Sequence, residues 1–307
     1  MRAITYSRYG GSDVLETTEQ PTPKVGPDSV LVRVRAASVN PVDWKIRAGY
    51  LDQVMDVTFP VVPGWDVAGV VERVGLDTPE LQVGDEVFGY VRKDWVQGGT
   101  FAELVSAPVR TLARKPASLT FEEAAAVPLA GLTAYQTIER TEVRAGQTVL
   151  VHAAAGGVGQ FAVQIAAARG ARVIGTASEG NHAYLRDLGA EPVTYGDGLV
   201  ERVRALAPEG VDVVLDYGTP DLVATTRALL APGGTVASIT DAAARDELGG
   251  HYVWVRPSTA DLTALAELAD AGVLRVDVAQ VFDLADAAAA HDASATGHVR
   301  GKVVVRV

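Results

Sequence analysis

The pattern of hydrophobic and polar positions changes once along the chain, near residue 119. Before that point short segments alternate with a period of two. In SVLVRVRAAS, residues 29–38, the side chains of Val30, Val32 and Val34 face one way and those between them face the other. Pro and Gly interrupt these segments at TPKVGPDS, LQVGDEV and QGGTFAE. We expect several short antiparallel strands, folded as a small barrel or sandwich, up to about residue 116.

After residue 119 the chain repeats a strand followed by a helical stretch. The apolar runs predict strands at residues 148–152, 172–176, 192–195, 211–217, 235–240 and 252–256. Alternation of this kind favours a right-handed, parallel α/β sheet with helices on both faces. The last thirty residues return to strand, Ala-rich helix and strand, and we assign them to the first domain.

The segment HAAAGGVG, residues 152–159, directly follows the first of these strands. Ala153, Gly156 and Gly159 fit the spacing A-x-x-G-x-x-G, a variant of the dinucleotide fingerprint with alanine in the first position. Gly156 allows a pyrophosphate to approach the backbone, and Gly159 allows the next helix to lie close to the strand. The amides of Gly157 and Val158 are expected to bind that pyrophosphate at the positive end of the helix.

An apolar face predicts that this helix is amphipathic. The positions that form the face recur at helical spacing and are Val158, Phe161, Ala162, Ile165 and Ala166. A tight turn in any α/β protein is the alternative interpretation of the glycines. The order of strand, turn, helix and second strand favours dinucleotide binding.

The end of the second strand indicates which dinucleotide binds. An NAD enzyme usually has an acidic residue there, whereas this chain has Ala177, which leaves room for a 2′-phosphate. Ser178, Asn181 and Tyr195 offer donors to that phosphate. The alternatives are that Ser178 only caps the next helix, and that Glu179 with no adjacent cation weakens phosphate binding. NADPH is the favoured cofactor.

Composition limits the classes of function. The 307 residues include 27 Lys and Arg against 38 Asp and Glu, a net charge of −11 that disfavours nucleic acid and anionic membrane surfaces as partners. The chain contains no cysteine, which excludes disulfides and cysteine-based zinc sites. No leader or membrane-spanning run is recognisable, so we expect a cytoplasmic protein.

Several motifs in order resemble the zinc-independent quinone oxidoreductase branch of the medium-chain dehydrogenase/reductase superfamily. They are NPVDWKIRAGY, PGWDVAGVV, VGDEVFGY, VPLAGLTAYQ, HAAAGGVG and GKVVV. The resemblance implies a GroES-like catalytic domain formed by residues 1–120 and 273–307, and a Rossmann NADP-binding domain at residues 121–272. It also implies an NADPH-dependent reductase of quinones or of activated alkenes such as enones and alkenals.

The resemblance places Asn40 and Asp43 beside the nicotinamide, with Asn40 as an oxyanion donor, and Tyr50 in the substrate cleft as a possible proton donor that competes with solvent. The alternatives are that Asn40 starts a turn, that Asp43 pairs with Lys45 or a backbone amide, and that Tyr50 only packs. Further cofactor contacts implied by the resemblance are Thr133, Ile239, Val255 and Arg256.

No catalytic metal is expected, because Gly64, Trp65 and Asp66 occupy the segment that carries a zinc ligand in related enzymes. Trp65 is expected to form an apolar wall instead. The five histidines are scattered singly, and each is interpreted as a surface residue or a core residue with satisfied hydrogen bonds. Lys302 is expected to be solvated.

Other functions remain open at this stage. A methyltransferase is disfavoured because its acidic residue and G-x-G-x-G turn are missing. A catalytically silent NADPH-binding protein of the same fold is the second candidate function. We expect a homodimer formed by edge-to-edge pairing of the segment HYVWVRP.

Overall fold

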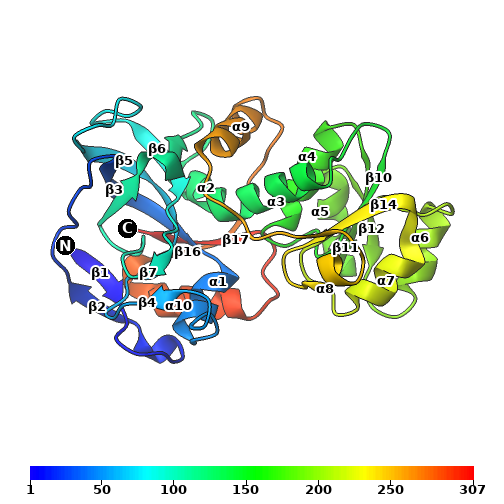
Figure 1. The fold of residues 1–307 in the computed structure, drawn as a ribbon, viewed down its shortest axis with the longest axis horizontal. Coiled ribbons are helices and arrows are strands. Elements are labelled where there is room, and N and C mark those ends of the chain that lie inside the picture. The colour runs from blue at the N-terminus through cyan, green and yellow to red at the C-terminus, as the bar shows by residue number, and fades with distance from the viewer. The chain divides into compact units, whose positions relative to one another are not determined.

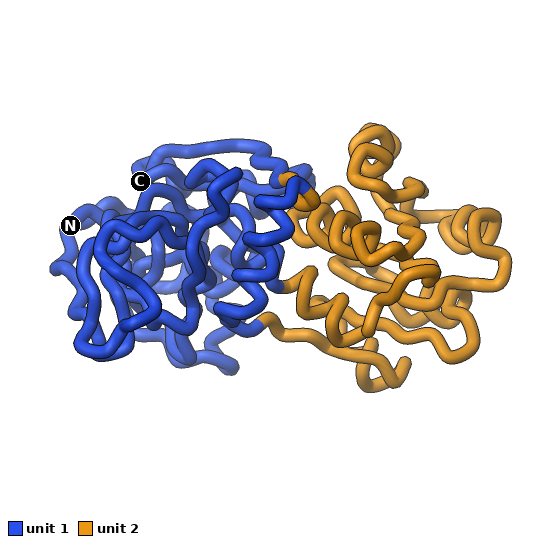
Figure 2. Tube along the Cα trace, turned by 90° about the horizontal axis from the view of Figure 1, so that it is seen from above, with its two compact units in different colours: residues 1–132, 256–272, 276–307 blue, residues 133–255, 273–275 orange.

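The structure is a computed structural model that describes all 307 residues, and the chain forms two compact units, coloured separately in Figure 2. Unit 1 contains Met1–Leu132, Arg256–Gly272 and Val276–Val307. Unit 2 contains Thr133–Val255 and Val273–Arg275. Both ends of the chain therefore lie in unit 1.

Unit 1 is built on a seven-stranded sheet in the order β16-β17-β3-β5-β6-β9, with β8 paired to β3 (Figure 1). Its strands are β3 (Ser29–Val39), β5 (Asp66–Val74), β6 (Glu86–Tyr90), β8 (Leu104–Pro108), β9 (Leu112–Arg114), β16 (Val278–Asp283) and β17 (Lys302–Arg306). Two smaller sheets pair β1 (Arg2–Thr5) with β2 (Glu16–Glu19), and β4 (Asp56–Val57) with β7 (Trp95–Val96).

The period of two in β3 produces its burial, because Val30, Val32 and Val34 are in the core while Arg33 and Arg35 are exposed. The C-terminal strand β17 runs antiparallel to β3, so the last residues of the chain complete the sheet. This pairing agrees with the assignment of the tail to the first domain, and it brings the start of β17 beside the end of β3.

The helices of unit 1 cover this sheet and carry part of the expected second domain. They are α1 (Pro41–Arg47), α2 (Phe121–Ala126), α9 (Thr259–Asp270) and α10 (Ala287–Ala295), with the short turns η1 (Ser12–Val14), η2 (Val109–Thr111) and η4 (Leu284–Asp286). Helix α3 (Pro128–Arg140) begins in unit 1 and continues into unit 2.

The boundaries of the two compact units differ from the expected domain boundaries at residues 120 and 272. Helix α9 belongs to unit 1 because its Asp270 side chain accepts a hydrogen bond from the Ser118 amide at 2.9 Å and its Leu265 packs against Gly131. The functional division into a catalytic and an NADP-binding domain remains a prediction.

Unit 2 contains a six-stranded, wholly parallel sheet in the order β12-β11-β10-β13-β14-β15. Its strands are β10 (Thr148–Val151), β11 (Arg172–Ala177), β12 (Ala190–Thr194), β13 (Val211–Asp216), β14 (Leu230–Ser238) and β15 (His251–Tyr252), and its other elements are α4 (Gly159–Ala168), η3 (Glu179–Asn181), α5 (His182–Asp187), α6 (Leu199–Leu206), α7 (Leu222–Leu229) and α8 (Ala243–Asp246). This is the doubly wound order of a Rossmann fold, and its switch point lies between β10 and β13.

The sixth strand is shorter than expected. Only His251 and Tyr252 pair with β14, because β14 ends at Ser238 and offers no partner to residues 253–256 beyond one bond from the Val253 amide. β15 is an edge strand, and the homodimer expected from it remains a prediction.

The prediction that α4 is amphipathic is wrong, because the helix has no exposed polar face between Gly159 and Ala166. All residues from Gly159 to Ala166 are buried, including Gln160 and Gln164. The Gln164 amide donates to the carbonyl of Arg275 at 3.0 Å and accepts from its amide at 2.8 Å, so the short segment 273–275 covers the polar side of the helix.

Candidate functional site

The turn between β10 and α4 is the first candidate region. Ala153 has φ +52°, in the left-handed region where a side chain is disfavoured, and its amide donates to Thr176 Oγ1 at 3.1 Å. This is the fingerprint position that normally holds glycine, so alanine adopts the backbone shape of the usual residue with some strain.

The backbone amides of Gly157 and Val158 donate no hydrogen bond to the rest of the chain. The amide of Gly159, the first residue of α4, is likewise unpaired, whereas the amides of the next three residues donate to the carbonyls of Gly156 and Val158. A run of unpaired amides at the positive end of a ten-residue helix is suited to an anion. The residues present therefore fit the pyrophosphate of a dinucleotide.

The two fingerprint glycines have different surroundings. A Cβ on Gly159 would lie 2.3 Å from the Ala153 carbonyl oxygen and 2.6 Å from Ala154 Cα. A Cβ on Gly156 would meet only the Ala153 oxygen, at 3.2 Å. Gly159 is thus required by packing of the helix on the turn, while Gly156 leaves open space that a ligand can enter.

The end of β11 carries no carboxylate, since its last residue is Ala177. The Ser178 side chain makes no capping bond to the following turn and instead accepts from the Asn181 amide group at 3.2 Å. Tyr195 follows the neighbouring strand β12 and is 59% exposed. These side chains leave space and donors for a phosphate beside the second strand.

Arg202 was not among the residues that the sequence led us to expect near the end of β12. Its guanidinium donates to the Thr194 carbonyl at 2.7 and 3.0 Å, at the end of β12. The arginine lies eight residues beyond the strand, on α6, and only the helix geometry returns it to the strand end.

Polar side chains also gather at the carboxyl ends of β10, β13 and β14. Asp216 Oδ2 accepts from Ser238 Oγ at 2.6 Å and from Thr240 Oγ1 at 3.1 Å. His152 is buried, and burial lowers its pKa while the nearby Asp216 charge opposes that shift. In a doubly wound sheet, these strand ends border the ligand crevice.

The remaining expected cofactor contacts lie along both units. Thr133 is buried on α3, and Ile239 directly follows β14, where its amide donates to the Asp216 carbonyl at 3.3 Å. Val255 is the last residue of the main segment of unit 2, and Arg256 is the next residue, in unit 1. Their contact with a cofactor remains a prediction.

A buried polar network in unit 1 is centred on Asn40. Its Nδ2 donates to Asp66 Oδ2 at 2.8 Å, and its Oδ1 accepts from the Lys302 ammonium. Asp66 also accepts from Ser38 Oγ at 2.7 Å and from the Leu129 amide at 2.8 Å. The side-chain amide of Asn40 therefore links the Lys302 ammonium to the Asp66 carboxylate.

The expectation that Lys302 is solvated is wrong. Its side chain is 3% exposed and lies 3.9 Å from Asp66 Oδ2. Burial lowers the pKa of Lys302, and the Asp66 and Asp43 charges oppose that effect. Burial also raises the pKa of Asp66, whereas Lys302 and three hydrogen-bond donors favour its ionised form.

Asp43 has a weaker set of partners. Its Oδ2 accepts a hydrogen bond from the backbone amide of Asn40 at 2.7 Å, and such a bond is one of the alternatives that the sequence left open. Desolvation by burial and the neighbouring Asp66 raise the pKa of Asp43 to about 7, although the Asn40 hydrogen bond and Lys302 lower it. At neutral pH this carboxyl is therefore partly protonated.

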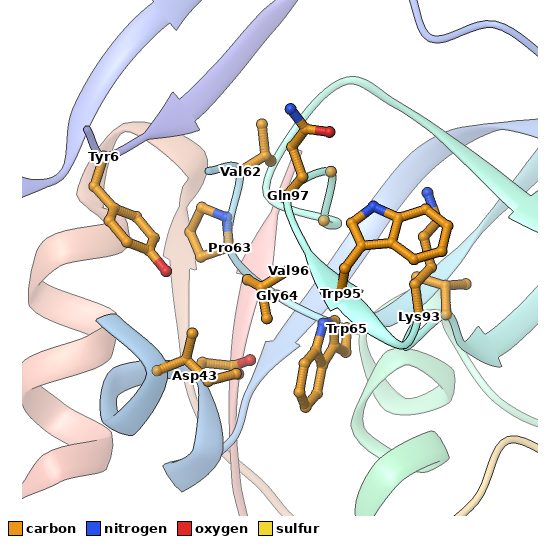
Figure 3. A pocket seen from close by; sticks show the side chains of 14 residues that line it. Tyr6, Asp43, Val62, Pro63, Gly64, Trp65, Lys93, Trp95, Val96 and Gln97 are labelled. Carbon is orange, nitrogen blue, oxygen red and sulfur yellow. The ribbon is translucent and has the colours of Figure 1, made fainter. Parts of the chain in front are cut away.

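A small pocket in unit 1, with a volume of about 10 Å³, lies beside this carboxyl (Figure 3). Asp43 and Tyr6 line one side, and Trp95 and Lys93 line the opposite side. Trp65 also lines the pocket, is buried, and packs edge-on against Tyr90 with ring centroids 5.9 Å apart. The residue in the place of a metal ligand is therefore an aromatic wall.

Tyr50 lies elsewhere. Its side chain is 73% exposed and it is not among the residues that line the pocket. It follows α1 and Gly49, where the chain has left the helix. Its role as a proton donor remains a prediction without support from this geometry.

The histidines are not all satisfied as expected. His291 is buried, both of its ring nitrogens lack a hydrogen-bond partner, and desolvation lowers its pKa to about 3. It packs edge-on against Phe101, with centroids 5.5 Å apart. No group of three or more His, Cys, Asp or Glu side chains in the chain is arranged to hold a metal ion.

None of the helices has the length and apolar character needed to cross a membrane.

Comparison with known proteins gives matches along the whole chain. Residues 26–117 match the family described as alcohol dehydrogenase GroES-like domain, and residues 188–305 match the family described as zinc-binding dehydrogenase. The NADPH-dependent alkenal/one oxidoreductase of Arabidopsis thaliana chloroplasts is 36% identical over 316 aligned positions, which cover 99% of this chain and 79% of that protein.

Solved structures are similar over the same length. The quinone oxidoreductase from Coxiella burnetii has 34% identity and a TM-score of 0.88, covering 100% of this chain and 99% of that one. A mycobacterial protein solved in complex with NADPH has 30% identity and a TM-score of 0.85, covering 100% of both chains.

Proposed function

Because the chain belongs to the quinone oxidoreductase branch of the medium-chain dehydrogenase/reductase superfamily, we propose that it is an NADPH-dependent reductase of quinones or of activated alkenes such as enones and alkenals. The observation that carries the proposal is the turn after β10, where the amides of Gly157 and Val158 are unpaired at the switch point of the sheet. The Arabidopsis relative is an alkenal/one oxidoreductase and the Coxiella relative a quinone oxidoreductase, which supports both acceptor classes.

The cofactor is held by the residues of unit 2. The unpaired turn amides bind the pyrophosphate, and Ser178, Asn181 and Tyr195 surround the 2′-phosphate in the space that Ala177 leaves open. When bound, NADPH supplies a hydride. The mycobacterial structure solved with NADPH supports this choice of cofactor.

The residues of unit 1 provide for the acceptor. A conjugated carbonyl is already electrophilic, and addition of a hydride gives a delocalised enolate or phenolate, so no metal is required to polarise it. Trp65 provides a flat apolar wall, which suits an aromatic or conjugated ring and excludes water. Lys302 and Asp66 fix the Asn40 side chain, which is buried and is not among the residues that line the pocket, so an oxyanion contact through its second Nδ2 hydrogen requires the site to open.

Asp43 is the group best placed to return the proton. Its carboxyl lines the pocket, and its raised pKa keeps the acid form populated up to about pH 7. Transfer of that proton to the enolate completes reduction of an enone, and solvent then reprotonates Asp43. Tyr50 is a weaker candidate because it is exposed and outside the pocket.

The test is the oxidation of NADPH, followed by its absorbance, with three acceptors at equal concentration: a quinone, an alkenal and a saturated ketone. We expect consumption with the quinone or the alkenal and none with the ketone. Cofactor binding without consumption for any acceptor supports the catalytically silent alternative. Failure to bind NADPH contradicts both functions.

A cytoplasmic location and a homodimeric state remain expectations drawn from the sequence.

A further inference from the structure

A second pocket of unit 1 is unusually basic for this chain. Three cations line it, Arg92, Lys93 and Arg110, against a single carboxylate, Asp94. The chain as a whole has a net charge of −11, so an excess of cations around one pocket runs against its overall balance. The pocket has a volume of about 380 Å³.

Carboxylates of the chain neutralise these cations only in part. Arg110 is paired with Asp28 at 3.2 Å. The Arg92 guanidinium is 3.7 Å from Asp94, whose side chain is 96% exposed and therefore contributes little. Lys93 has no carboxylate within ion-pair distance. Its half-buried ammonium thus carries charge that no carboxylate of the chain balances, and the Arg92 guanidinium is balanced only weakly by the exposed Asp94.

Arg92 also has an orphaned donor. Its side chain is 15% exposed, and its Nε is buried without a hydrogen-bond partner. The Nε itself is closed to solvent, so only the terminal nitrogens of the guanidinium can meet a molecule in the pocket. Burial lowers the pKa of Lys93, as expected for an ammonium that lacks a nearby anion.

This basic pocket shares its wall with the pocket beside Asp43. Lys93 and Trp95 line both of them, and Figure 3 shows these two side chains on the side opposite Asp43. Trp95 is 51% exposed, so it presents its indole to the space rather than closing it. A molecule held by the cations can therefore extend past Trp95 toward the small pocket beside Asp43.

We propose that the acceptor carries an anionic group, a carboxylate or a phosphate, which Arg92 and Lys93 bind in the basic pocket while its conjugated carbonyl points toward Asp43. The proposal rests on the reductase function above and defines its substrate class. The planar guanidinium suits two oxygens of such a group at once, and the lysine adds a point charge.

The test uses the full chain and three enones with the same reacting group: one ends in a carboxylate, one in the methyl ester of that carboxylate, and one in a phosphate. For the unmodified protein we expect a KM at least tenfold lower for the carboxylate than for the ester. Lys93→Met and Arg92→Met are each expected to bring the ratio of the two KM values close to one. Lys24→Met removes the same charge from an exposed site and is expected to keep the ratio.

A binding measurement separates this proposal from the proposed function. Calorimetric titration with the saturated carboxylate, which accepts no hydride, is expected to give a dissociation constant that rises at least tenfold in Lys93→Met. If either substitution at these two cations prevents folding, the other serves alone. Lower KM and tighter binding for the phosphate enone identify phosphate as the group.

Equal KM values for acid and ester in the unmodified protein overturn this inference, and turnover of the ester leaves the reductase function standing. If no enone is reduced, the reductase function fails, and the calorimetric result alone decides whether the basic pocket binds anions. A heat of binding that is unchanged in Lys93→Met contradicts the assignment.

Discussion

Replacement of Gly159 by alanine tests the packing of α4 on the glycine turn. The added Cβ would lie 2.3 Å from the Ala153 carbonyl oxygen and 2.6 Å from Ala154 Cα, whereas comfortable contacts lie at about 3.5 Å or more. Both neighbours are backbone atoms of the turn, so they move only if the helix moves away from β10. We expect Gly159→Ala to separate these elements.

The expected magnitude follows from the overlap. Adding one methyl group to a packed region costs about 1–3 kcal/mol, and a clash with backbone places this substitution at about 3 kcal/mol. At about 2–4 °C per kcal/mol, the Tm falls by roughly 6–12 °C. Gly156→Ala is the matched control, because its Cβ meets a single atom at 3.2 Å and we expect a loss of stability below about 1 kcal/mol.

NADPH affinity is expected to change strongly in the control variant Gly156→Ala, although its stability does not. Gly156→Ala keeps its fold but places a methyl group where the pyrophosphate approaches, so we expect at least tenfold weaker NADPH binding. Thermal unfolding and calorimetric titration measure both quantities. A Gly159→Ala protein with the Tm of the unmodified chain refutes the packing argument, and a Gly156→Ala protein with full affinity refutes the assignment of the turn to the diphosphate.

Three further results are expected. Ala153→Gly relieves the left-handed strain of about 1–2 kcal/mol at φ +52° but loosens the unfolded chain, so urea unfolding is expected to show a net gain of about 0.5–1 kcal/mol, and a loss contradicts this. Lys302→Met removes the cation beside Asp66 and is expected to cost about 3–5 kcal/mol near pH 8 by the same assay, while a cost below 1 kcal/mol contradicts the ion pair. Because the raised pKa of Asp43 keeps its proton only below about pH 7, enone reduction is expected to fall tenfold per pH unit above that value; Asp43→Asn removes this dependence, and an unchanged profile in that variant contradicts the proton role.

The glycine turn was predictable because its parts are adjacent in sequence. Strand β10, the residues from Ala153 to Gly159 and helix α4 follow one another within twenty-one residues, so spacing alone defines their geometry. The same holds for Ala177, which ends the next strand. Local order also predicted the parallel sheet, with errors confined to strand ends and to the short β15.

The polar network was not predictable in the same way. Lysine is usually exposed, so the sequence predicts a solvated Lys302. Its burial results from the pairing of β17 with β3, which brings it to Asn40, 262 residues away along the chain. The burial of Gln164 likewise depends on a distant segment, through Arg275. Of the cations of the basic pocket, Arg92 and Lys93 lie on a loop and Arg110 on the short turn η2, and such segments carry no periodic signal.

An enone bound as acceptor is expected to receive the hydride at its carbon–carbon double bond and to keep its carbonyl. NADPH labelled with deuterium at the transferable position tests it directly, with an enone as acceptor and the product analysed by NMR and mass spectrometry. We expect one deuterium on the β-carbon of a saturated ketone whose carbonyl is intact. An allylic alcohol with deuterium on the former carbonyl carbon, or a product without label, contradicts it.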